Sequence, residues 1–268
     1  MAVTETEPAA PATCKLRLPS LEIRQFRAFD HLRIETLGRV NLITGRNNVG
    51  KTSVLEAAYL FARRGTGLPL YELLSARDEF AGVSVSERPD ETWSPTGERD
   101  LDLYPLTIKN LFHGRKDFDD FPETIRIGPI DDPDETLQIG AGWYRVLVEQ
   151  TTEGQPTQRF APLSPADLKS AIDPLPHVSV RMGQGPVAYY SLAQLSDRRS
   201  YLLRMGSLAQ DKHALFVKAS GIESTLIAHL WNKIQLSPLE DEVNAALRII
   251  DPDVERVSVR IDSGTPPR

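Results

Sequence analysis

A nine-residue segment, Gly45 to Ser53, constrains this chain more than any other feature. It reads Gly-Arg-Asn-Asn-Val-Gly-Lys-Thr-Ser and fits the spacing G-x-x-x-x-G-K-[ST]. A loop of this type wraps backbone N–H groups around the phosphates of a nucleoside triphosphate, sends a lysine to the β- and γ-phosphates and offers a hydroxyl to Mg²⁺. The segment therefore predicts a phosphate-binding loop, the Walker A motif.

The residues on either side of the loop support this interpretation. Arg39 to Thr44 is a short β-prone run that ends at Gly45. After Lys51, apolar residues recur at helical spacing, at Val54, Leu55, Ala58, Phe61 and Ala62. Strand, loop and helix follow in the order that the chemistry needs, whereas a surface turn with an accidental lysine, the alternative, would need no such flanks.

Each loop residue has an expected role. Gly45 and Gly50 lack a Cβ, so the backbone can turn tightly and approach an oxyanion closely. Lys51 is the phosphate-bridging cation, Thr52 is the Mg²⁺ ligand, and Ser53 adds an N–H and a hydroxyl near the α-phosphate. No residue is assigned a catalytic role. The expected nucleotide-binding residues are Gly45, Arg46, Asn47, Asn48, Val49, Gly50, Lys51, Thr52 and Ser53.

Composition limits the surroundings of this site. The 268 residues carry a net charge of −6, so no global basic field argues for nucleic acid, although a local basic patch stays open. Cys14 is the only cysteine, which excludes an internal disulfide and a multi-cysteine metal site. No run approaches the length of a membrane span, and we expect a cytoplasmic protein. Residues 1–20 are acidic and rich in Pro and Ala, and they indicate a disordered leader.

Two further strands are predicted before the loop strand. Leu21 to Phe26 alternates between apolar and polar residues, and Leu32 to Leu37 partly does so, with Phe29-Asp30 as the spacer between them. In most simple proteins with such a loop the loop follows the first strand. Here an antiparallel pair comes first.

From Leu21 to Phe61 the chain resembles the N-terminal lobe of the ABC-type ATPases of the RecF, SMC and OLD group within the AAA ATPases. The segment Gln25-Phe26-Arg27-Ala28-Phe29 matches the "N-F-R-x-F/H" pattern of that group, and Leu55-Glu56-Ala57 also fits it. The resemblance implies that Arg27 approaches the nucleotide phosphates; an exposed arginine at a strand end is the alternative. It also implies ATP and Mg²⁺ as cofactors, a homodimer that sandwiches ATP, and a DNA or nuclease partner.

The rest of the chain predicts a mixed architecture. Strands are expected at 125–127, 137–139, 143–149 and 187–191, with a loop-rich stretch before 185 and a buried strand at 214–217. A helix is expected at 224–235. A second follows Ser237, with Pro238 and Glu240 completing a capping box, and buries Leu239, Val243, Ala246, Leu247 and Ile250. These two resemble the helical arm of OLD-like ATPases without long coiled coils. The acidic clusters at 118–122 and 131–135 are interpreted as solvated loops.

Three segments that the resemblance calls for do not occur in convincing form: a glycine-containing signature, an apolar strand ending in Asp-Glu, and a downstream histidine. Leu195–Arg199 lacks the glycines, Pro252 stands where the glutamate would follow Asp251, and Val257–Asp262 alternates. We therefore expect an α/β P-loop NTPase: an ABC-ATPase-like head with an antiparallel β-subdomain and a helical segment, the C-terminal lobe missing. Its parts are the 21–65 core, a 66–185 β-rich and loop-rich insert, and a 186–268 strand plus helical arm.

Three classes of function compete. The first is the ATP-binding part of a RecF/OLD-like ATPase in DNA repair or defence against foreign DNA, whose hydrolysis needs the absent segments. The second is a GTPase, but Asn232-Lys233-Ile234-Gln235 lacks the aspartate that reads guanine, and no aspartate has a glycine three residues later. The third is a non-catalytic nucleotide-binding scaffold. The five histidines show no metal-ligand spacing, and the basic pairs Arg63-Arg64 and Arg198-Arg199 are interpreted mainly as solvated faces.

Overall fold

The computed structural model describes residues 16–77, 79, 108–115, 124–150, 156–171, 174–192, 195, 214–219, 221–222 and 224–258. Most of the expected leader, the acidic cluster at 118–122 and residues 196–199 lie outside these residues. The chain divides into two compact units, residues 1–214 and residues 215–268. Each unit is described by itself.

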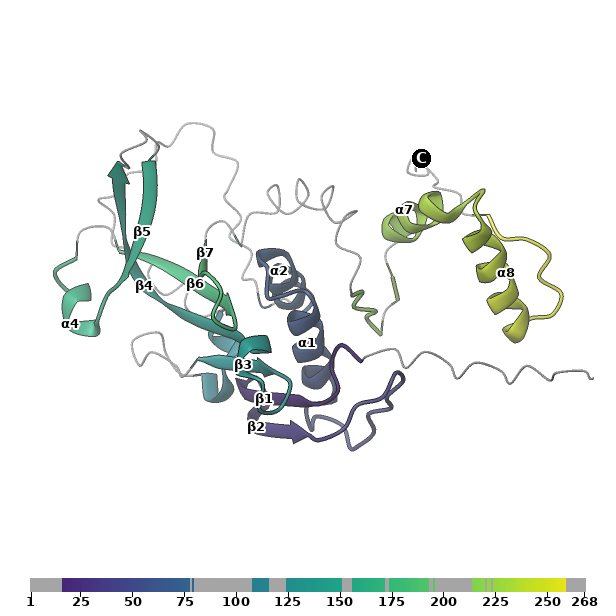
Figure 1. The fold of residues 1–268 in the computed structure, drawn as a ribbon, viewed down its shortest axis with the longest axis horizontal. Coiled ribbons are helices and arrows are strands. Elements are labelled where there is room, and N and C mark those ends of the chain that lie inside the picture. Colours follow the sequence, from purple (N-terminus) through teal and green to yellow (C-terminus); the bar gives the residue numbers. More distant parts are fainter. Residues whose placement is uncertain are drawn as a thin grey trace, which may run out of the picture. The chain divides into compact units, whose positions relative to one another are not determined.

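A single antiparallel sheet forms the frame of the first unit (Figure 1). Its strands lie in the order β2-β1-β3-β4-β6-β7, and β5 pairs with the far half of β4. Every pairing is antiparallel. The strands are β1 (Leu21–Phe26), β2 (Phe29–Ile34), β3 (Ile125–Gly128), β4 (Leu137–Gln150), β5 (Pro156–Pro162), β6 (Leu175–Met182) and β7 (Ala188–Ser191).

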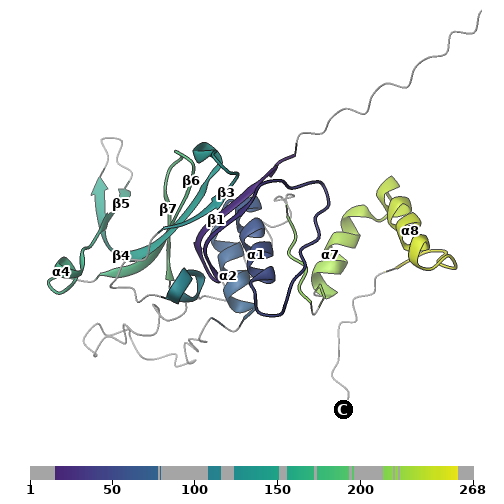
Figure 2. The same cartoon turned by 90° about the horizontal axis from the view of Figure 1, so that it is seen from below.

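Two helices cover one face of this sheet, α1 (Lys51–Ala62) and α2 (Gly67–Ser75) (Figure 2). On β1, β3, β4 and β6 the side chains alternate, and most of those that point toward the helices are buried. The short helical segments are η1 (Lys109–Leu111), η2 (His113–Arg115), η4 (Pro133–Glu135) and α4 (Pro165–Leu168). The core of this face includes Leu21, Ile23, Ile125, Ile127, Leu137, Ile139, Val178 and Val180, with Leu60 and Leu70 from the helices.

The first hairpin is tighter than the sequence predicts. Its second strand is Phe29–Ile34 instead of 32–37, and Phe29 pairs directly with Phe26. The reversal therefore occupies only Arg27 and Ala28. Gln25 and Arg27 both take positive φ values, 56° and 48°, which let the chain turn earlier than the alternation suggests.

The expected strand at Arg39–Thr44 does not form. Val40 is 92 % exposed and Leu42 is 88 % exposed, and no ladder partner lies beside them among the described residues. A strand needs a neighbour to accept and donate its backbone hydrogen bonds, and an apolar run alone does not supply one. The expected buried strand at 214–217 is also wrong, because Leu215 and Val217 are about half exposed and no strand is assigned there.

The second unit contains α7 (Ser224–Ile234) and α8 (Pro238–Ile250), which confirms both expected helices. The expected capping box does not form, because Glu240 binds the N–H of the residue before the N-cap and Ser237 does not cap the helix. Glu240 accepts from the Leu236 N–H at 2.7 Å, whereas the Ser237 hydroxyl turns back and donates to the Ile234 carbonyl at 2.6 Å. The first turn of α8 thus receives no side-chain cap from Ser237.

The expected apolar stripe of α8 is not its buried face. Ile250 is 83 % exposed and Leu239 is half exposed, whereas the polar residues Glu240 and Asn244 are buried. The segment 251–258 folds back along the helix: Arg256 pairs with Glu240 at 2.9 Å, and Val257 donates its N–H to the Asn244 side chain. Polar side chains are buried here because backbone and guanidinium groups satisfy them.

Replacing Glu240 with Gln should loosen α8 at neutral pH and not in acid. The Leu236 N–H and then Arg256 lower the pKa of Glu240 below its usual 4.5, so its stabilising effect exists above that pH and is lost as the pH falls through the lowered pKa. Amide hydrogen exchange in α8 should therefore be faster in the variant at about pH 7 and should approach that of wild type at an acidic pH below the lowered pKa of Glu240. Asp241→Asn, which removes an exposed neighbouring carboxylate, is the control; a variant with unchanged exchange at both pH values would contradict the prediction.

Candidate nucleotide-binding site

The loop from Gly45 to Gly50 leads directly into α1, the helix that packs beneath β1 and β3. Gly50 is the N-cap residue of α1 and has a φ of 95°, in the left-handed region that favours glycine. No side chain caps this helix, and its first turn holds no acidic residue. The first N–H groups of α1 are therefore available to an anion, and the helix dipole favours negative charge at the same place.

Lys51 folds over the loop it follows. Its Nζ donates to the Gly45 carbonyl at 2.8 Å and to the Arg46 carbonyl at 2.6 Å. Both ends of the predicted motif thus meet at one ammonium group. Thr52 is exposed in the first turn of α1, whereas Ser53 is buried, 4 % exposed. The donor set fits a triphosphate with Mg²⁺: free N–H groups and a cation for the phosphates, and a hydroxyl within the same turn for the metal.

The β1–β2 hairpin forms the wall behind the loop. A Cβ added at Gly50 would lie 2.6 Å from Cζ of Phe29 and 3.1 Å from Cβ of Ala28. Real Cβ atoms do not approach other atoms this closely, so Gly50 is required by packing as well as by its φ value. The antiparallel pair that precedes the loop in sequence therefore contacts it in space.

Arg27, in the turn of that hairpin, is buried among carboxylates. Its Nε forms an ion pair with Glu56 of α1 at 2.7 Å, and its two terminal nitrogens donate to Glu79 at 2.9 and 3.0 Å. The side chains of Arg27 and Glu56 are 5 % and 3 % exposed. Arg77 donates to the same Glu56 at 2.9 Å. The alternative of an exposed strand-end arginine is thus wrong.

The backbone of Arg27 is fixed as well. Its N–H donates to the Leu111 carbonyl at 2.8 Å, and its carbonyl lies 3.0 Å from Nδ1 of His113. Glu56 stands five residues after Lys51, which places it about 7.5 Å along the axis of α1 from the loop. The guanidinium is therefore held beside the body of the helix. Contact between Arg27 and a phosphate stays a prediction.

Burial dominates the protonation of Glu56. It raises the pKa of that carboxyl above its usual value, against the opposing effect of the Arg27 and Arg77 guanidinium groups. The raised pKa means that burial makes the ionised form of Glu56 less favourable in the protein than in water. Loss of either arginine would make the charged form costlier still.

The structure brings the predicted loop residues together at the start of α1 and keeps Arg27 behind them. Sequence reasoning missed Glu56, Glu79 and His113, which hold the hairpin turn in place; Glu56 lies within a quoted motif, but nothing in the motif assigns it a partner. The interpretation of the pair Arg63-Arg64 as a solvated face is wrong for Arg63, which is 5 % exposed, whereas Arg64 is exposed as expected. Within the described residues no group of three His, Cys, Asp or Glu side chains could hold a metal ion.

The fold and this site together define an α/β protein with a P-loop-type nucleotide-binding segment. Residues 20–58 match the model of a family described as "AAA domain". This range holds β1, the hairpin, the loop and the first two turns of α1, so the match covers the site that the geometry identifies.

Two curated proteins are similar to short parts of the chain. One is "Uncharacterized protein MJECL10" of Methanocaldococcus jannaschii, 38 % identical over 58 residues, which are 22 % of this chain and 26 % of that protein. The other is "DNA replication and repair protein RecF" of Clostridioides difficile, 38 % identical over 47 residues, 18 % of this chain and 13 % of that protein. The matches thus span about a quarter and an eighth of these relatives. No solved structure matches.

The comparisons support a P-loop ATPase family of the AAA type. The family match covers β1, the hairpin, the loop and the start of α1. Of the helices in the described part of the chain, none has the length and apolar character to cross a membrane.

Proposed function

We propose that this chain is the ATP-binding part of a RecF/OLD-like ATPase with an ABC-type head. One observation carries the proposal: the uncapped N-terminus of α1 and the Lys51 ammonium converge on one loop of the expected spacing. The likeness to RecF supports an ATPase over the GTPase alternative. Because RecF is by name a replication and repair protein, a role in DNA repair or defence belongs to the same proposal.

In this proposal the chain binds ATP with Mg²⁺ at Thr52 and does not hydrolyse it alone. The sequence holds no convincing signature segment and no apolar strand that ends in Asp-Glu. The exposure of Val40 and Leu42, next to the loop, supports the same view, since this β-prone run has no strand partner among the described residues. A second head or an additional segment would complete both the sheet and the catalytic centre.

Calorimetric titration with ATP and GTP, each with and without Mg²⁺, tests the proposal. We expect ATP to bind, Mg²⁺ to tighten binding, and Thr52→Ala to remove most of that Mg²⁺ effect while leaving Mg²⁺-free binding intact. Ser75→Ala, which removes a hydroxyl far along α2, is the matched control. Preferential binding of GTP would overturn the ATPase assignment. Measurable turnover by the chain alone would overturn the claim that hydrolysis needs a further segment.

A further inference from the structure

The sheet has a second face, opposite α1 and α2, which we call the outer face. Its positions follow from the ladder register, because residues directly opposite each other point to the same side. On β2, β1, β3, β4 and β6 one row of paired residues is His31, Arg24, Arg126, Gln138 and Arg181. Adjacent strands lie about 4.8 Å apart, so the row crosses about 19 Å of surface.

This row is basic on a chain whose net charge is −6. Across the outer-face positions of these five strands there are four arginines and one carboxylate, Glu22. Glu22 is shared by Arg24 at 2.9 Å, His31 at 2.8 Å and Arg33 at 3.8 Å. Within the described part of the chain, the exposed Arg126 has no ion-pair partner, and Arg181 contacts only the neutral Gln138, at 2.8 Å. Arg33 also lies near Glu35 at 3.4 Å and Asp131 at 3.9 Å, so among the described residues the unbalanced charge of this face is that of Arg126 and Arg181.

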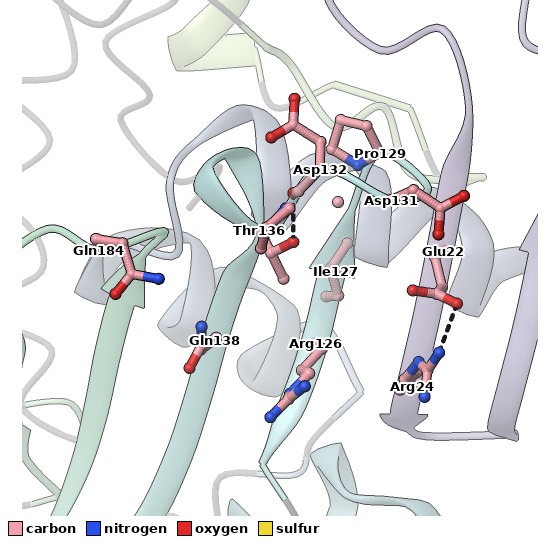
Figure 3. Close-up of a pocket in the computed structure, with 12 residues that line it drawn as sticks. Glu22, Arg24, Arg126, Ile127, Pro129, Asp131, Asp132, Thr136, Gln138 and Gln184 are labelled. Carbon is pink, nitrogen blue, oxygen red and sulfur yellow. Dashed lines mark hydrogen bonds and ion pairs between the residues drawn. The ribbon is translucent and has the colours of Figure 1, made fainter.

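Figure 3 shows Arg24, Arg126 and Gln138 side by side on three neighbouring strands, at the floor of an open hollow. Asp131 and Asp132 close one end of this hollow. Beyond the row in the other direction the outer face is smooth, since Gly140 pairs with Ser179 and neither presents a bulky side chain. A polyanion lying on the row is thus repelled at one side and unobstructed at the other.

An aromatic cluster lies on that unobstructed side. Tyr189 on β7 pairs with Ser179 on β6. Ser179 lies one same-face step, about 7 Å, along β6 from Arg181. Its ring stacks on Phe160 with centroids 4.2 Å apart and meets Tyr144 edge-on at 5.2 Å. His177 packs beneath, 5.1 Å from Phe160. Except for His177 these rings are only partly buried, so part of the aromatic surface of the cluster is exposed to solvent.

We propose that the outer face binds single-stranded nucleic acid, with phosphates along the Arg24–Arg126–Arg181 row and bases directed across Gly140 and Ser179 toward Tyr189. Cationic side chains that follow a backbone, beside aromatic rings on which bases stack, are the two components of sequence-tolerant single-strand binding. A duplex would hide its bases and use only the arginines, and an acidic peptide would make no use of the rings. The surface is separate from the loop, so it does not depend on the proposed ATP binding.

Fluorescence anisotropy of the full chain with a labelled oligo-dT of about 15 nucleotides tests this proposal. The variant Arg126→Gln/Arg181→Gln should weaken binding at least tenfold. Its slope of log affinity against log salt should be smaller by about 1.4, because each lost phosphate contact removes about 0.7. The matched control is Arg145→Gln/Lys169→Gln, which removes two exposed charges away from the outer face and should change affinity less than threefold.

A second set of variants tests the aromatic cluster. Tyr189→Leu should weaken binding about tenfold, whereas Tyr189→Phe, which keeps the ring, should bind within twofold of wild type. Unchanged thermal unfolding of each variant shows that the fold is intact. Lys51→Ala should bind oligo-dT as wild type does without nucleotide, which separates this surface from the loop. Equal affinity for a duplex, equal competition by polyglutamate, or an equal loss in the control variant would overturn the proposal.

Discussion

Replacing Lys51 with alanine is expected to abolish ATP binding, with a loss on the order of 100-fold or more in affinity. The Lys51 ammonium makes its two contacts with carbonyls of the loop itself, at Gly45 and Arg46. It is already placed where the two ends of the motif meet. Titration calorimetry measures the loss directly. A thermal shift with ATP provides a second reading, because a ligand stabilises a protein only as far as it binds.

The matched control is Lys169→Ala, since Lys169 is an exposed lysine just after α4. It should bind ATP like wild type. Without ATP the Lys51→Ala protein should unfold at nearly the wild-type temperature, because its two hydrogen bonds are exposed. Wild-type affinity for ATP in the Lys51 variant would show that the loop is not the nucleotide site.

Arg27→Met is expected to destabilise the first unit by about 3 kcal/mol, the usual result of leaving a buried charge without its partner. Glu56 is 3 % exposed and would keep only Arg77, while Glu79 would lose both of its hydrogen bonds to the guanidinium. Methionine preserves much of the apolar stem, so the loss reports on charge. Urea unfolding measures it, and the loss should shrink in acid, where neutral Glu56 needs no counter-ion.

The double variant Arg27→Met/Glu56→Gln removes both members of this ion pair and so tests the same interaction. Removing the buried charge together with its partner should recover a good part of the lost stability. Arg24→Met, which breaks an exposed pair with Glu22, is the control and should cost less than about 1 kcal/mol. An Arg27 variant as stable as this control would contradict the buried network.

The double variant also decides what Arg27 does for the nucleotide. If it regains stability and ATP affinity together, Arg27 acts by holding the hairpin wall behind Gly50. If it regains stability but still binds ATP weakly, a phosphate contact by Arg27 is supported. These two outcomes cannot be separated with Arg27→Met alone, since an unstable wall would weaken binding by itself.

The sequence predicts the loop, α1 and the presence of β1 because these features depend on local pattern. The spacing from Gly45 to Ser53 is recognisable without a fold, and the apolar period after Lys51 is that of a helix packed on one side. The two helices of the second unit were predicted for the same reason. Helix bounds follow from residues close in sequence, such as the Pro238 that opens α8.

The features that the sequence does not predict depend on contacts between residues far apart in the chain. The sequence predicts loop where β6 forms, because prolines and a histidine mask the alternation of Val178 and Val180, yet pairing with β4 makes this segment a strand. Arg39–Thr44 looks like a strand and lacks a partner within the described residues. In α8 the buried side chains are Glu240 and Asn244 instead of the apolar stripe. The segment 251–258 brings Arg256 to Glu240 and a backbone N–H to Asn244. The partners of Arg27 lie 29 and 52 positions away, and no local pattern links them.

The contact between Phe29 and Gly50 means that the structure of the loop depends on the preceding β1–β2 hairpin. A shortened chain that began after β2 would retain every residue from Gly45 to Ser53 and all of α1. It would nevertheless lose the aromatic ring that fills the space behind Gly50 and the arginine that neutralises Glu56. We therefore expect the smallest part of this protein able to hold a phosphate chain to start at β1, some two dozen residues before the motif.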